Sequence, residues 1–330
     1  MAKLLEIVPI EDVELGKVAR LVAQQQERAH AASAVVPDTL ADPTSAEASL
    51  RLRLEKGYVG RVALAAGTPV GVLLGNAEGV TADLPAGGFA IADSQEDPTQ
   101  VLAELYGEVA PHLLAHGATR HYLSHLNTPA AIQAATDVGF ARTSYCAIRP
   151  VDTARPSSSD GSGVTVREGT PDDLEIIARL CMVEVEYRYV PPVYTPRPKR
   201  ERTLENLMES HGKLRQKGGA HLIATLGGKD VGVLTLDAMS HAPALCPKDQ
   251  PFIGSTATTA DARGRGVGTA MVEAALRWAA ERGHDGVTVS FQPSNRVSRR
   301  FWLGAGFIPT GFWSLRVIPE SYATPQDATT

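Results

Sequence analysis

Arg263-Gly264-Arg265-Gly266-Val267-Gly268 places three glycines and two arginines in six residues, at the start of a predicted helix. Glycine lets a backbone come close to an oxyanion, and a helix start presents free N–H groups carrying about half a positive charge. The two arginines can add side-chain charge. The stretch therefore predicts a phosphate cradle, although a ligand-free surface turn would use the same residue types.

The elements around this loop follow in a fixed order. A predicted strand at 252–258 precedes it, and apolar residues at helical spacing continue from it to 281. A strand at 287–291, a helix at 295–303 and a strand at 312–318 follow. Upstream, Gly227-Gly228-Lys229-Asp230 is typical of a hairpin turn between two strands. A Rossmann or P-loop site does not fit, because the glycine spacing differs and no Lys-Ser/Thr follows.

Composition excludes several classes of function. The 330 residues are 43% hydrophobic and carry 32 Lys and Arg against 37 Asp and Glu, a net charge of −5. This gives no basic field for nucleic acid or an anionic membrane surface, so we expect neither as a partner. The start of the chain does not resemble a signal peptide, which predicts a cytoplasmic protein. The three cysteines are far apart and suggest neither a disulfide nor a metal site.

The chain repeats itself about a polar midpoint. Pro69-Val70-Gly71-Val72-Leu73 matches Asp230-Val231-Gly232-Val233-Leu234, and Gly139-Phe140 matches Gly306-Phe307. Residues 151–163 have the composition of a linker. We therefore predict two α+β domains, 1–150 and 164–330, each a mixed and mainly antiparallel sheet flanked by helices.

The second half resembles the GCN5-related N-acetyltransferase (GNAT) superfamily. The resemblance rests on the loop from Arg263 to Gly268, the strand before it, and Asn295 followed at the family's spacing by Gly306-Phe307. It covers 164–318 and implies an acyl-CoA-dependent N-acetyltransferase with no metal. The first half would be a degenerate copy of the same fold.

The resemblance also assigns roles to individual residues. The Thr258 amide would polarise the thioester carbonyl, and Thr256 and Thr258 would pair with the pantetheine arm as a further strand does. Asn295 would hydrogen-bond the pantetheine, although a helix N-cap explains this residue equally well. Arg300 is a candidate for a phosphate contact. The remaining expected cofactor contacts are Arg263, Gly264, Arg265, Gly266, Val267, Gly268 and Thr269.

One departure from the family affects the catalytic acid. Trp302 occupies the position where many relatives have a tyrosine that protonates the leaving thiolate. An indole N–H cannot serve as a general acid, but Trp302 could still line the pocket.

The expected acceptor wall is a segment rich in tyrosine and glutamate. Glu186 and Tyr194 are its candidate catalytic residues, and packing of the segment on the sheet is an equal alternative. The expected contacts with the acceptor substrate are Glu186, Tyr187, Tyr189, Tyr194, Asp237 and Trp302.

The first half lacks the cradle. Its counterpart, Asp93-Ser94-Gln95-Glu96-Asp97-Pro98-Thr99, has three carboxylates and no glycine, and would repel a diphosphate. We therefore expect only the second half to bind acetyl-CoA. It would pass the acetyl group directly to the amine of a small molecule, as a monomer or homodimer. The alternatives are a non-catalytic CoA-binding sensor or scaffold, and transfer of a longer acyl group such as succinyl or malonyl.

Overall fold

The computed structural model describes residues 5–151, 163–193, 203–238, 244–247 and 249–319. It divides into two compact units, each described here by itself: unit 1 comprises 1–146 with 309–330, and unit 2 comprises 147–308. Among the described residues no helix combines the length and apolar character needed to cross a membrane.

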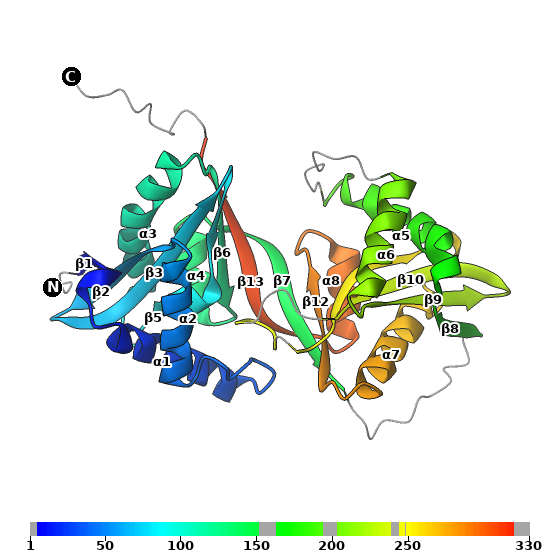
Figure 1. Ribbon diagram of the computed structural model, residues 1–330, viewed down its shortest axis with the longest axis horizontal. Helices are drawn as coiled ribbons and strands as arrows, with labels where there is room; N and C mark the ends of the chain where they lie inside the picture. The colour runs from blue at the N-terminus through cyan, green and yellow to red at the C-terminus, as the bar shows by residue number, and fades with distance from the viewer. Residues whose placement is uncertain (1–4, 152–162, 194–202, 239–243, 248, 320–330) are drawn as a thin grey trace. The chain divides into compact units, whose positions relative to one another are not determined.

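Unit 1 is an α+β domain built on a mixed sheet (Figure 1). The strand order is β1-β2-β3-β4-β6-β13-β7, and β5 pairs with β3. Helix α3 packs its apolar face on this sheet and forms much of the core with Phe89 and Phe140. The elements are β1 (Glu6–Pro9), α1 (Leu15–Ala32), α2 (Pro43–Glu55), β2 (Val59–Ala65), β3 (Thr68–Glu78), β4 (Thr81–Leu84), β5 (Phe89–Ile91), α3 (Pro98–Ala115), β6 (Arg120–Leu126), α4 (Pro129–Asp137), β7 (Ala141–Pro150) and β13 (Ile308–Val317).

Unit 2 repeats this plan with fewer strands. Its sheet has the order β12-β11-β10-β9-β8, and the C-terminal residues of β7 follow β12. Only the β11–β12 pair among these five strands is parallel. The elements are β8 (Val164–Glu168), α5 (Leu174–Arg188), α6 (Leu204–Gln216), β9 (Ala220–Leu226), β10 (Lys229–Asp237), β11 (Phe252–Thr258), α7 (Val267–Ala280), β12 (Gly286–Phe291) and α8 (Arg296–Gly304).

The predicted fold class is confirmed in both units. Strand β11 has the bounds that the sequence predicts, 252–258. Helix α2 was not predicted; only Ala46 and Leu50 along it are buried, so its sequence shows little apolar periodicity.

The last strand lies in unit 1, although the sequence assigns it to the C-terminal domain, 164–330. Strand β13 pairs antiparallel with β6 from Gly311–Leu126 to Val317–Arg120. The Nε2 atom of buried His125 lies 3.1 Å from the Ser314 hydroxyl, and Arg316 donates to the Val138 carbonyl at 2.6 Å. Hydrogen bonds to distant strands decide this placement, and local sequence does not encode them.

We therefore expect truncation of the chain after residue 308 to destabilise the fold of unit 1. Without β13, the β6 edge loses its ladder partner and buried His125 loses its contact with Ser314. Limited proteolysis of the truncated chain is expected to cleave within 1–146 at least tenfold faster than in the full chain. Equal resistance would contradict this role for β13.

A buried histidine pair makes unit 2 sensitive to acid. His221 on β9 is fully buried, and its Nε2 lies 3.1 Å from Nδ1 of His211 on α6. Burial, with smaller contributions from His211 and Arg215, lowers the pKa of His221 from 6.5 to about 3. The unfolded chain thus takes up this proton near pH 6.5 and the folded chain only near pH 3, so stability falls as the pH drops between these values.

We expect the free energy of unfolding to fall by up to about 1.4 kcal/mol per pH unit below pH 6.5 through His221. Urea unfolding at pH 7.0 and 4.5 measures this slope. His221→Leu should flatten it, whereas His116→Gln, at an exposed position, should leave it unchanged. An unchanged slope in His221→Leu would remove His221 as the cause.

Candidate functional site

The glycine loop of unit 2 opens directly into helix α7. Gly264 and Gly266 have φ angles of +73° and +83°, a left-handed conformation that strains other residues. Gly266 is the N-cap, and no side chain caps the helix. The first amides of a helix have no partner within it, so those of Val267, Gly268 and Thr269 are placed to receive an anion.

Close packing holds the first turn of α7 against α8. A Cβ atom built on Gly268 would lie 3.0 Å from two ring atoms of Phe301. Gly268 is therefore required by packing as well as by any ligand, and its replacement must displace Phe301.

Five exposed arginines add positive charge to the loop and to helix α8. Arg263 and Arg265 are exposed on the loop, and Arg296, Arg299 and Arg300 are exposed on α8. Arg263 also folds back, donating to the Thr258 carbonyl at 3.4 Å and placing its guanidinium carbon 5.9 Å from the centroid of the Tyr187 ring. These groups can neutralise a diphosphate and a further phosphate.

Strand β11 presents a free backbone edge beside the loop. The Thr259 amide donates to the Val231 carbonyl on β10 at 2.8 Å. Backbone groups alternate along a strand, so the amides of Thr256 and Thr258 point away from β10, toward β12. Within the described strands, β12 pairs with β11 only at Phe252 and Ile253. The edge at Thr256 and Thr258 is therefore open to an extended ligand.

A bulge precedes this edge. Thr235 on β10 stands opposite two residues of β11, Gly254 and Ser255, and its buried hydroxyl accepts the Ser255 amide at 2.8 Å. Such a bulge bends the strand, which accounts for the separation of β11 from β12 after Ile253.

Asn295 is the N-cap of α8. Its Oδ1 accepts the Ser298 amide at 3.0 Å. This is the structural role that the sequence left open, and it leaves the Nδ2 group as a donor for a ligand.

Trp302 is a core residue. It is 5% exposed and packs edge to face on Phe301 and Phe307, with ring centroids 4.9 and 5.1 Å away. Trp302 therefore contributes to core packing. Its indole N–H can donate a hydrogen bond but cannot act as a general acid.

The predicted acceptor residues are only partly brought together. Tyr187 and Tyr189, at the end of α5, are half-buried, whereas Glu186 is exposed. Asp237 is paired with Phe252, at the opposite end of β11 from Thr258, about 20 Å along the strand. Tyr194 lies outside the described residues. Glu184 belongs to the same segment but is not among the predicted site residues; its side chain is 16% exposed and forms an ion pair with Arg188.

The same strand edge exists in unit 1, in the same register. Gly71 pairs with Ile91 as Gly232 pairs with Thr258, and the Ala92 amide donates to Val70 at 2.9 Å as that of Thr259 does to Val231. Ile91 thus corresponds to Thr258, and Phe89 to Thr256.

In unit 1 a side chain closes this edge. Buried Gln25 on α1 accepts the Ile91 amide and donates to the Phe89 carbonyl, both at 3.0 Å. A carboxamide can donate and accept at once, so Gln25 satisfies the two groups that an added strand would bind.

The cradle is also missing from unit 1. A Cβ atom on Gly71 would meet Val101 and Leu105, as one on Gly232 would meet Val267 and Met271, which aligns α3 with α7. Helix α3 nevertheless begins three residues before Val101, at Pro98, and the Asp97 carboxylate accepts the Gln100 amide at 3.0 Å. A capped helical turn replaces the glycine loop, and aspartate replaces Arg263.

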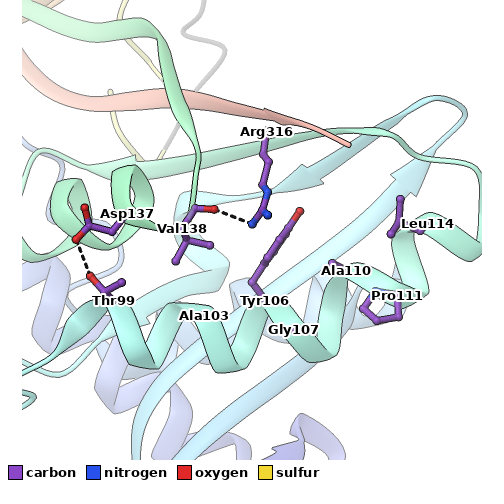
Figure 2. A pocket seen from close by; sticks show the side chains of 10 residues that line it. All are labelled: Thr99, Ala103, Tyr106, Gly107, Ala110, Pro111, Leu114, Asp137, Val138 and Arg316. Carbon is purple, nitrogen blue, oxygen red and sulfur yellow. Dashed lines mark hydrogen bonds between the residues drawn. The ribbon is translucent and has the colours of Figure 1, made fainter. Parts of the chain in front are cut away.

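A surface hollow of about 510 Å³ runs along α3 in unit 1 (Figure 2). Its polar rim is bonded to the protein: Arg316 donates to the Val138 carbonyl, and the Thr99 hydroxyl donates to Asp137 at 3.0 Å. The hollow is lined by Thr99, Ala103, Tyr106, Gly107, Ala110, Pro111, Leu114, Asp137, Val138 and Arg316.

Comparison with known proteins identifies unit 2. The model of the acetyltransferase (GNAT) family matches residues 182–307, which span the glycine loop, β11 and Asn295. These residues form a GNAT acetyltransferase domain. This match assigns the domain to the acyl-CoA-dependent N-acyltransferases as a general class. The comparison with curated proteins found no match.

Solved structures extend the fold to the whole chain. A GCN5-related N-acetyltransferase from Sphaerobacter thermophilus is 17% identical, with a TM-score of 0.54 over 94% of each chain. A tandem GNAT protein from the clavulanic acid biosynthesis pathway is 16% identical, covering 98% of this chain and 100% of that chain, with a TM-score of 0.47. A predicted acetyltransferase with acetyl-CoA from Clostridium acetobutylicum is 16% identical over 44% of this chain and 91% of that chain, with a TM-score of 0.36. The first of these supports a GNAT-like fold for both units.

We expect one acyl-CoA site per chain. Gln25 and the Asp97-capped turn occupy the groups in unit 1 that correspond to the open edge and cradle of unit 2. Calorimetric titration of the full chain with acetyl-CoA should give a stoichiometry of one, and Gly266→Val should weaken binding at that single site. The full chain is required because a fragment 1–150 lacks β13. A second site that survives Gly266→Val would contradict the expectation.

Proposed function

We propose that the GNAT domain transfers an acetyl group from acetyl-CoA to the amine of a small molecule by direct attack. The observation that carries this proposal is the open edge of β11 ending at an uncapped, glycine-rich helix start. A strand-like pantetheine arm and a diphosphate have the shape and charge that these two features accept.

In the proposed mechanism, backbone amides and arginines bind the donor, and one amide stabilises the developing oxyanion. Amides of the α7 first turn and the arginines bind the phosphates, while Thr256 and Thr258 align the pantetheine arm. The free Thr258 amide donates to the thioester carbonyl, where negative charge develops as the amine attacks. Coenzyme A leaves as a thiolate, and a thiol pKa of about 8.5 makes it a good leaving group without a strong acid.

The net negative charge of the chain favours a small cationic acceptor. The net charge is −5, and half-buried Tyr187 and Tyr189 lie at the end of α5, close to the loop through the Arg263–Tyr187 contact. Aromatic faces and carboxylates bind ammonium groups well.

The burial of Trp302 supports a second candidate function. With no acid at this position, the domain could bind acyl-CoA as a sensor or scaffold without transferring the acyl group. Release of free thiol from acetyl-CoA, measured with putrescine, glucosamine, phenethylamine and kanamycin, distinguishes the two. Tight binding with only background release for every amine would favour the sensor. The same assay with succinyl-CoA and malonyl-CoA tests for a longer acyl donor.

Replacing Gly266 tests the cradle. Valine at a φ of +83° is strained by about 1–2 kcal/mol and turns the helix-start amides away from the phosphates. We expect the Kd for acetyl-CoA, measured by calorimetry, to rise at least tenfold in Gly266→Val. Gly107→Ala is the control, because a Cβ there meets nothing within 4 Å.

A second variant, Arg265→Gln, tests the cradle at an exposed side chain, so its result does not depend on whether Gly266→Val folds correctly. It should weaken binding severalfold and reduce its dependence on salt. Affinity unchanged in both Gly266→Val and Arg265→Gln would refute the proposed site.

A further inference from the structure

The two units contain corresponding helices that face the strand edge. Ala19-Arg20-Leu21 on α1 matches Ala178-Arg179-Leu180 on α5, and the alanine and leucine are buried in both helices. Gln25 and Glu184 each come four residues after the matched leucine. Glu184 is therefore the counterpart of Gln25.

The contacts of Gln25 indicate where Glu184 lies. Gln25 bridges the Ile91 amide and the Phe89 carbonyl, the counterparts of the Thr258 amide and the Thr256 carbonyl. Glu184 is on the inner face of α5, between Cys181 and Val185, which are 0% and 3% exposed. Its carboxylate thus faces the edge that would carry the pantetheine and thioester, whereas Glu186 faces solvent.

The exchange of glutamine for glutamate changes what this position can do. A carboxylate accepts hydrogen bonds but cannot donate one to the Thr256 carbonyl, so it cannot close the edge as Gln25 does. The edge remains available to acyl-CoA, and a negative charge stands beside it. Arg188 pairs with Glu184, but its side chain is 40% exposed, so an incoming ammonium group can take its place.

We propose that Glu184 is the carboxylate that binds the acceptor amine and takes its proton, an inference that rests on the proposed acetyltransferase function. The ammonium group gives one proton to Glu184, and its freed electron pair forms the C–N bond at the thioester carbon. Collapse of the tetrahedral oxyanion, held by the Thr258 amide, breaks the C–S bond, and the thiolate leaves with that electron pair. The second N–H proton goes to the thiolate, and Glu184 returns its proton to solvent.

Two substitutions of Glu184 test its position and its chemistry separately. Glu184→Gln recreates the Gln25 bridge, so we expect acetyl-CoA affinity, measured by calorimetry, to fall at least tenfold. Glu184→Ala cannot bridge the edge and should bind acetyl-CoA as the unmodified protein does. Its kcat/KM for the best amine of the panel should fall about 100-fold, with loss of the acidic limb of the pH profile.

The matched control is Glu175→Gln. Glu175 forms the same i,i+4 pair with Arg179 on α5, but at an exposed position, so both affinity and rate should be unchanged. Unchanged affinity in Glu184→Gln, or an unchanged rate in Glu184→Ala, would overturn the inference, as would loss of activity in Glu186→Gln alone. If the unmodified protein failed to bind acetyl-CoA, the proposed function would fall first, and that result is distinct from either of these.

Discussion

The proposed chemistry rests on the open edge of β11, where the sheet leaves the amides of Thr256 and Thr258 without a strand partner. The amides of Thr256 and Thr258 point away from β10, and the pairing of β11 with β12 ends at Ile253. The Thr235 hydroxyl stabilises the bulge that produces this separation, by taking the Ser255 amide. Because main-chain groups tolerate any side chain, such an edge can bind a substrate arm without a distinctive sequence.

The two units differ at few of the groups that lie along this strand edge. They share register, helix packing and the Gly-Val-Leu strand, yet unit 1 closes the edge with Gln25 and replaces the cradle with a turn capped by Asp97. Both changes satisfy buried or helix-terminal polar groups internally, so unit 1 keeps its fold without a ligand. In unit 2 the corresponding groups remain available to a ligand.

Several residues of the proposed site also have a structural role. Asn295 uses one amide atom to cap α8 and keeps the other as a donor, while Gly268 admits Phe301 as well as exposing its own amide. Trp302 is buried and packs between Phe301 and Phe307.

The fold class, the order of strands and helices and the glycine-rich helix start at 263–268 can be predicted from the sequence, because these depend on local periodicity, glycine and charge. The tertiary contacts add that β13 completes the sheet of unit 1, that Glu184 is largely buried whereas Glu186 is exposed, and that Gln25 bonds to strand residues 64 to 66 positions away. These features arise from hydrogen bonds between distant segments and from the direction a side chain takes from its helix. Neither can be predicted from the spacing of residue types along the chain.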